Sequence, residues 1–311
     1  MPTATVKLST GKTTFNYTIS TPSTSSAISI DRNLPTLLFI HAFYLGSRIF
    51  QRPTDKKFNC VAVDLRLHGL TTSDPLPKGY SAKDTAEDVA LFMDTIKLPA
   101  CHIVGLSMGS TIAISLAVYY PNQVASLFLV SPLGLEEMSP MAGWEIAEYW
   151  REAFKTDDPD MAAISDSVYG AHQLGFNNNL DDLVNACNCV PGSFEQYDRA
   201  VVGFISNRKE YTNDQFSRIS APVKLVHCLG SIAYPQEYSE KFMQQLKDAA
   251  VNAPHFGVVT HGDIVNRLLY AFIIDSWWMS VPPAPQEVSS PWEAELAKAG
   301  WKKSGNDPED D

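Results

Sequence analysis

Gly105-Leu106-Ser107-Met108-Gly109 is the stretch that decides the fold of this chain. It follows an apolar run at residues 101–104, typical of a buried strand, and precedes small and apolar residues at 110–117, typical of a packed helix. A G-x-S-x-G sequence between a strand and a helix predicts a nucleophile elbow. Its glycines let the two elements cross closely, while the serine takes a strained turn that lifts its hydroxyl above the sheet. The stretch therefore predicts a nucleophilic Ser107.

Strands and helices are predicted to alternate on both sides of this elbow. Continuous apolar runs at 37–40, 60–63, 127–130 and 223–226 indicate strands buried on both faces. Helical spacing runs from 81 to 96, where Ser81 is the expected cap, and a long helix is expected from about 263 to 279 after a weak strand near 249–252. Two short edge strands are expected at 6–8 and 14–19. The pattern predicts an α/β fold with a doubly wound, mostly parallel sheet.

The alternation stops between residues 134 and 216, where helical patterns occur without strong strand runs. We interpret residues 134–216 as an inserted helical cap, and residues 1–133 and 217–280 as the α/β core. Residues 281–311 are rich in proline and acidic residues, which predicts an extended tail.

Composition narrows the classes of partner. The 311 residues are 45% hydrophobic and 19% charged, as in an ordinary globular protein, and the net charge of −11 argues against nucleic acid or an anionic membrane as a partner. The N-terminal residues lack the apolar segment of a secretory signal, and no run is long enough for a membrane span, so a cytoplasmic location is expected. The five cysteines lack zinc-type spacing, and we expect no metal.

A serine nucleophile needs a base from elsewhere in the chain. Among the seven histidines, His255 follows the weak strand near 249–252 and precedes the last long helix. The carboxyl ends of strands in open α/β sheets are where ligands bind, so His255 is the predicted base. His261, at the start of the same helix, is the fallback.

Four segments resemble, in the same order, those of the α/β-hydrolase superfamily, specifically its capped, single-domain serine hydrolases. They are a His-Gly-x-like oxyanion loop at 41–43, an Asp-x-Arg-Gly-His-Gly-like loop at 64–69, the elbow, and a Gly-His-Phe-like loop at 254–256 before a closing helix. The resemblance covers residues from about 15 to 279. It implies that Ser107 and His255 react together, and that the N–H groups of Phe43 and Met108 form the oxyanion hole.

The chain departs from this family's pattern at two places. Ala42 replaces the usual glycine of the oxyanion loop, and we expect it to restrict the backbone. The family's acidic residue, which orients the histidine, has a serine at both customary positions, Ser231 and Ser131. Three interpretations stay open: Glu136 or its neighbour Glu137 is a displaced acid, Ser231 orients a serine–histidine dyad through a water, or the scaffold binds a ligand without turning it over.

The leading expectation is a cofactor-free serine hydrolase acting on an ester or lactone of an apolar small molecule. Serine at the elbow argues against epoxide hydrolases and dehalogenases of this fold, which use aspartate there. The aromatic residues Tyr44, Trp144 and Trp150 are expected either to line the substrate cleft or to pack in the cap. The alternatives are a ligand receptor or pseudo-enzyme, and a C–C hydrolase or lyase of the same fold. The oligomeric state is not predicted.

Overall fold

The structure is a computed structural model. It describes residues 2–43, 45–50, 57–133, 199–200, 204, 211–229, 247–251 and 262–275. Most of the predicted cap and the whole predicted tail lie outside these residues, so the division into core, cap and tail stays a prediction.

The core is a twisted sheet of mostly parallel strands. Along the sheet the strands follow the order β1 (Thr3–Leu8), β2 (Gly11–Ser20), β4 (Asn59–Val63), β3 (Thr36–Ile40), β6 (Cys101–Leu106), β7 (Val124–Val130), β8 (Val223–Cys228) and β9 (Lys247–Val251). The pairs from β4 to β9 are parallel, whereas β1, β2 and the short β5 (Thr72–Ser73) pair in antiparallel fashion. The predicted doubly wound, mostly parallel sheet is confirmed.

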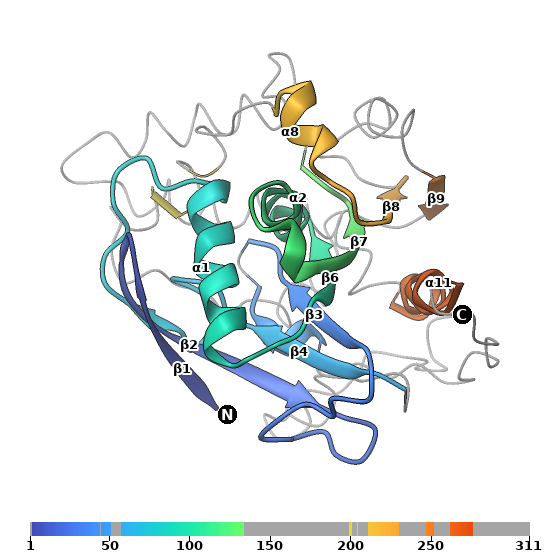
Figure 1. Ribbon diagram of the computed structural model, residues 1–311, viewed down its shortest axis with the longest axis horizontal. Helices are drawn as coiled ribbons and strands as arrows, with labels where there is room; N and C mark the ends of the chain where they lie inside the picture. The colour runs from blue at the N-terminus through green and yellow to red at the C-terminus, as the bar shows by residue number, and fades with distance from the viewer. Residues whose placement is uncertain are drawn as a thin grey trace, which may run out of the picture.

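Helices cover the two faces of this sheet. Figure 1 shows α1 (Ala82–Thr95) and α2 (Met108–Tyr119) on one side of the strands and α11 (Gly262–Asp275) on the other. Short helical turns, η1 (Ser47–Phe50), η2 (Pro121–Gln123) and α8 (Asn213–Ser217), lie in the connections. No helix of the described ranges has both the length and the apolar character needed to cross a bilayer.

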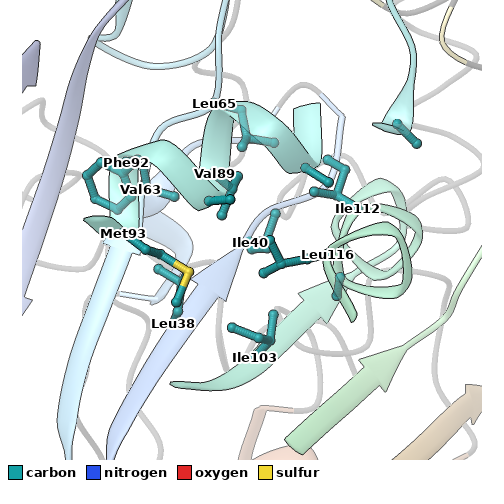
Figure 2. Close-up of a cluster of buried hydrophobic side chains, with 14 of the residues drawn as sticks. Leu38, Ile40, Val63, Leu65, Val89, Phe92, Met93, Ile103, Ile112 and Leu116 are labelled. Atoms are coloured by element: carbon teal, nitrogen blue, oxygen red, sulfur yellow. The ribbon is translucent and has the colours of Figure 1, made fainter. Parts of the chain in front are cut away.

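Successive residues of a buried strand enter different halves of the core. On β3, Leu38 belongs to the cluster packed by α1 and α2, whereas Leu37 belongs to the cluster packed by α11. Strand geometry produces this alternation because neighbouring side chains point to opposite faces. Figure 2 shows the first cluster, in which Met93 of α1 lies next to Leu38 of β3, and Ile112 of α2 lies on the side of Ile40. A strand with a continuous apolar run therefore packs against helices on both faces of the sheet.

Two details of the sheet differ from the sequence prediction. The strands at 6–8 and 14–19 were both expected at an edge. Of these two, β1 is at an edge, whereas β2 is internal because it pairs with both β1 and β4. The two-residue strand β5 was not predicted, since Thr72–Ser73 is too short to show an alternating pattern. The predicted start of α1 is confirmed: the Asp84 carboxylate accepts hydrogen bonds from the Ser81 N–H, at 2.9 Å, and from its hydroxyl, at 2.6 Å.

Candidate active site

Ser107 occupies a sharp turn between β6 and α2. Its φ of 51° and ψ of −115° place a non-glycine residue in a strained, positive-φ conformation. The Ser107 N–H donates to the Val130 carbonyl of β7 at 2.9 Å, and the Ser107 carbonyl accepts the Ser110 N–H at 2.8 Å. The turn is thus fixed by the neighbouring strand on one side and by the first turn of α2 on the other.

The glycines on either side of Ser107 allow the strand and helix to approach each other. A Cβ on Gly105 would lie 2.6 Å from the Gly109 carbonyl oxygen, and one on Gly109 would lie 2.1 Å from the Ile40 carbonyl oxygen. Both separations are far below a van der Waals contact, so only glycine fits at these positions. The same contact brings the start of α2, with Met108, against the carboxyl end of β3. The predicted elbow geometry is therefore present.

The predicted oxyanion loop begins at this carboxyl end of β3. Ala42 is fully buried and has a negative φ, because the described non-glycine residues with positive φ are Leu67, Lys97, Ser107 and Ser131. Ala42 therefore has a backbone conformation open to any L-residue, and the expected restriction of the loop stays a prediction. The Phe43 ring packs edge-to-face on Phe204 at a centroid distance of 5.4 Å. A residue from the predicted cap segment thus contacts the oxyanion loop.

His41 connects this loop to the loop after β4. It is fully buried; its Nδ1 lies 2.7 Å from the Ala42 carbonyl oxygen, and its Nε2 lies 3.0 Å from the Leu65 backbone nitrogen. Its ring also contacts the His68 ring, at a centroid distance of 4.9 Å. Burial lowers the pKa of His41, although the Ala42 hydrogen bond and the Asp64 charge oppose that shift. His41 is therefore neutral near pH 7.

Asp64 holds the loop after β4 in place. Its carboxylate accepts hydrogen bonds from the Ser47 N–H at 2.6 Å, the Leu70 N–H at 3.0 Å and the Asn16 side-chain amide at 2.7 Å. Burial alone would raise the Asp64 pKa. The backbone donors and the nearby His41 lower it by a larger amount, so the net pKa is below its usual value. A Cβ on Gly69 would lie 2.3 Å from this carboxylate. Asp64 thus has a structural role, and His68, whose ring contacts His41, belongs to the same set of buried contacts.

A second buried polar cluster lies beside this loop. The Tyr80 hydroxyl donates to the Asp88 carboxylate of α1 at 2.5 Å, and Arg66 lies 3.6 Å from the same oxygen. Arg66 also donates to Thr10 and to the Asp74 carbonyl. Burial raises the Asp88 pKa to about 6, against the lowering effects of Tyr80 and Arg66. The cluster ties α1 to the loop that follows β4.

Ser131 stands next to Ser107 at the carboxyl ends of two paired strands. Leu106 pairs with Val130 in the parallel register of β6 and β7, and the residue after each is a serine with positive φ. Ser131 has a φ of 45°, is 3% exposed, and its hydroxyl has no hydrogen-bond partner among the residues that the structure describes. A strained, buried serine thus lies beside Ser107 at this end of the sheet, which makes the strand end a candidate part of the site.

Of the predicted site residues, the structure describes Ser107 and Met108 at the start of α2, and Phe43 in the loop after β3, the strand against which α2 packs. The other predicted site residues lie outside the described residues: His255, Ser231, Glu136, Tyr44, Trp144 and Trp150. In the sequence, His255 lies between β9 and α11, and its predicted role as the base stays a prediction. Sequence reasoning missed His41 as a bridge between loops; the signal was its place directly after a buried strand and before the oxyanion residue.

Metal binding would need a group of ligating side chains. Within the described ranges, no three His, Cys, Asp or Glu residues are placed so that they could hold a metal ion. In the pair His41 and His68, each Nδ1 bonds to a backbone carbonyl, so these nitrogens are already used within the fold.

Comparison with known proteins places this geometry in a family. The family model described as the alpha/beta hydrolase fold matches residues 35–203. The chain is 42% identical over 102 residues to the dihydrolipoyllysine-residue acetyltransferase component of the acetoin cleaving system of Cupriavidus necator, covering 32% of this chain and 27% of that protein. It is 29% identical to a protein of Variovorax paradoxus named for the carbamate hydrolase RutD, over 73% of this chain and 88% of that protein. The chain thus spans about a quarter of the first relative and most of the second.

Solved structures share the fold at low sequence identity. An esterase from Thermogutta terrifontis matches with a TM-score of 0.68 at 16% identity, covering 88% of this chain and 99% of the esterase. An enol-lactonase from Burkholderia xenovorans matches with a TM-score of 0.66 at 15% identity, covering 84% and 96%. At such identities the likeness concerns the fold alone. The family model matches residues 35–203, more than half of the chain, and the solved structures share its fold. The chain therefore belongs to the α/β-hydrolase fold family.

Proposed function

We propose that this protein is a serine hydrolase that cleaves an ester or lactone of an apolar small molecule. The observation that carries the proposal is the strained Ser107, with a φ of 51°, between two glycines at which no Cβ would fit. Such strain at a buried turn persists only where surrounding contacts hold it, and it is concentrated at reactive groups. The names of an esterase, an enol-lactonase and a carbamate hydrolase among similar proteins favour the same class of reaction.

The proposed reaction has two halves. The Ser107 hydroxyl attacks the substrate carbonyl while His255 takes its proton, and the resulting oxyanion accepts hydrogen bonds from the Phe43 and Met108 N–H groups. His255 then gives the proton to the leaving alcohol, which leaves an ester on Ser107. Water attacks this ester, gives a proton to His255, and releases the carboxylic acid as the proton returns to Ser107. The start of α2 stabilises the oxyanion, because helix N-termini carry partial positive charge.

What orients His255 is the open part of this proposal. We favour Ser231, acting through a water, over Glu136 as a displaced acid. In both cases the imidazolium is stabilised less than by a directly bonded aspartate, so the rate is expected to be modest. Ser231→Asp should raise the rate of ester hydrolysis if the missing carboxylate limits it. An unchanged or lower rate would favour Glu136.

Turnover of p-nitrophenyl butyrate and of a simple δ-lactone, followed by absorbance and by pH indicator, tests the proposal. Wild type should hydrolyse at least one of them, and Ser107→Ala and His255→Ala should each lose activity by about 10⁴-fold or more. Equal turnover by Ser107→Ala would contradict the proposal.

A ligand-binding scaffold without turnover is the second candidate. It is favoured by the serine at position 131, one of the two customary acid positions, whose hydroxyl lacks a partner among the described residues. In that case wild type would hydrolyse neither substrate, yet apolar esters or lactones would still raise its melting temperature.

A further inference from the structure

The bonds of His41 determine which of its nitrogens carries the proton. A backbone N–H can only donate, so the Leu65 N–H, 3.0 Å away, requires that Nε2 of His41 is an unprotonated acceptor. Nδ1 of the neutral ring then carries the hydrogen and donates it to the Ala42 carbonyl oxygen at 2.7 Å. The ring is fully buried, and the His68 ring packs against it at a tilt of 49°. His41 thus has one fixed tautomer and one fixed direction of donation.

The carbonyl that accepts this hydrogen bond belongs to the peptide that links Ala42 to Phe43. A peptide unit is planar, and in its trans form the C=O and N–H point in opposite directions. A bond that fixes the Ala42 carbonyl therefore also fixes the direction of the Phe43 N–H. The Leu45 N–H makes a longer second contact to the same oxygen, at 3.3 Å. His41 supplies the shorter of the two contacts.

We propose that His41 is a positioning residue for the oxyanion hole: by holding the Ala42 carbonyl, it aims the Phe43 N–H at the substrate oxygen. The inference rests on the proposed function, because it needs a reaction in which that N–H is used. The Leu65 bond makes the arrangement rigid by tying His41 to the loop after β4, which Asp64 holds. Through His41, the loop at 64–70 thereby contributes to the position of the Phe43 N–H.

A purely structural role for His41 would give a different result when its two nitrogens are replaced separately. The asparagine amide nitrogen lies near the place of Nδ1, so H41N can keep the donor to Ala42 and lose the acceptor for Leu65. The glutamine amide oxygen lies near the place of Nε2, so H41Q can keep the acceptor and lose the donor. The proposal requires the donor, whereas a structural clip between loops requires either bond equally.

The test compares kcat and KM of H41N and H41Q, per active site titrated with a fluorophosphonate, and their affinity for a trifluoromethyl ketone that adds to Ser107. H41Q should lose about 10- to 100-fold in kcat with little change in KM, because removing an oxyanion donor outright costs about 10²–10³. Its affinity for the ketone should fall by a similar factor, while H41N stays within about threefold of wild type. Equal losses in the two variants, or a larger loss in H41N, would overturn the proposal.

His102 provides the matched control. It is also buried and bonds through Nδ1, to the Ser126 hydroxyl at 2.8 Å, but it lies at the opposite end of β6. H102N and H102Q should leave kcat unchanged. Loss of kcat in these variants would show that any buried histidine of the sheet matters equally, which also contradicts the proposal.

A measurement on the wild type covers the case in which H41Q does not fold. In ¹⁵N-labelled protein, the His41 ring should show the Nδ1–H tautomer, and its Nδ1 proton should shift when the ketone binds. An Nε2–H tautomer, or an Nδ1 proton unaffected by the ketone, would overturn the inference. The two proposals fail separately: equal turnover by Ser107→Ala rejects the proposed function, whereas Ser107-dependent turnover with equal H41N and H41Q rates rejects only the role of His41.

Discussion

The two ends of the parallel strands in this molecule are built differently. At the amino end, the Asn59 amide donates to the Asp31 and Leu34 carbonyls and to the Thr36 hydroxyl, and its oxygen accepts the Asp31 N–H. At the carboxyl end, Ser107 and Ser131 both have positive φ, and the Ser131 hydroxyl has no partner within the described residues. The Asn59 side chain at the amino end thus uses its polar atoms within the fold, whereas the two serines at the carboxyl end hold a strained backbone.

This difference indicates which end of the strands has polar groups available to bind a ligand or to react. A polar group whose bonds are all made within the fold contributes to stability but can do little with a ligand. Strained residues and buried polar atoms that lack a partner cost stability, and they are retained where a ligand or a reaction uses them. Substitutions at the two ends should therefore separate stability from activity.

The largest effect should come from Gly109→Ala at the carboxyl end. The added Cβ would lie 2.1 Å from the Ile40 carbonyl oxygen, so β3 and α2 must move apart. We expect a loss of at least about 3 kcal/mol in the free energy of unfolding, together with loss of ester hydrolysis. Urea denaturation measures the first. Gly79→Ala is the control: its φ is also positive, at 76°, but no atom lies within 4 Å of the new Cβ, so its cost should be about 1 kcal/mol.

Asn59→Ala tests the amino end. It removes four hydrogen bonds and leaves backbone groups of the Asp31–Leu34 segment without partners. We expect a loss of about 2–3 kcal/mol in the free energy of unfolding, with kcat and KM unchanged. A fall in kcat for the folded variant would mean that the two ends are not independent.

A pH titration of stability should reveal the buried Asp88. Its pKa is raised to about 6 from 3.8, mainly by burial, so the folded state binds its proton more tightly than the unfolded state. The stability this provides is fully present below pH 3.8 and is lost as the pH rises through about 6. The loss should be about 3 kcal/mol, since the pKa rises by about 2 units and one unit corresponds to about 1.4 kcal/mol. The measurement is the difference in urea midpoint between wild type and Asp88→Asn from pH 4 to 7, because His41 and His68, whose pKa values burial lowers, titrate in both proteins. A difference that does not change with pH would exclude the Asp88 effect.

The smallest effect should come from relieving strain at the two serines. Ser107→Gly and Ser131→Gly should each raise the free energy of unfolding by about 1 kcal/mol, because glycine adopts a positive φ without penalty. Only Ser107→Gly should abolish hydrolysis. Differential scanning calorimetry and ester turnover distinguish the two, and a destabilised Ser131→Gly would show that the hydroxyl has a partner that stabilises the fold.

Much of the fold was predictable because it depends on local patterns. The apolar runs at 37–40 and 101–104 and the glycines around Ser107 indicate strands and a close crossing whatever the rest of the chain does. The two-residue β5 and the internal position of β2 were not predictable, since both depend on which distant strand is the neighbour. The sharp turn at Ser107 was predicted correctly, but the hydrogen bonds of His41 were not, because one of them comes from the Leu65 backbone on another loop.

The acid position shows the limit of reasoning from sequence. Ser131 was recognised as one of two serines at customary acid positions, but its positive φ and its buried hydroxyl are properties of the folded chain. Sequence alone also could not show that Ala42 fits the oxyanion loop, since that depends on a φ set by β3 and α2.

The central claim is that Ser107 is an activated nucleophile. Mass spectrometry of wild type after treatment with a fluorophosphonate tests it most directly. The account predicts one covalent adduct per chain, on the peptide that contains Ser107, and none in Ser107→Ala. Absence of an adduct in folded wild type, or an adduct on another serine that persists in Ser107→Ala, would contradict it.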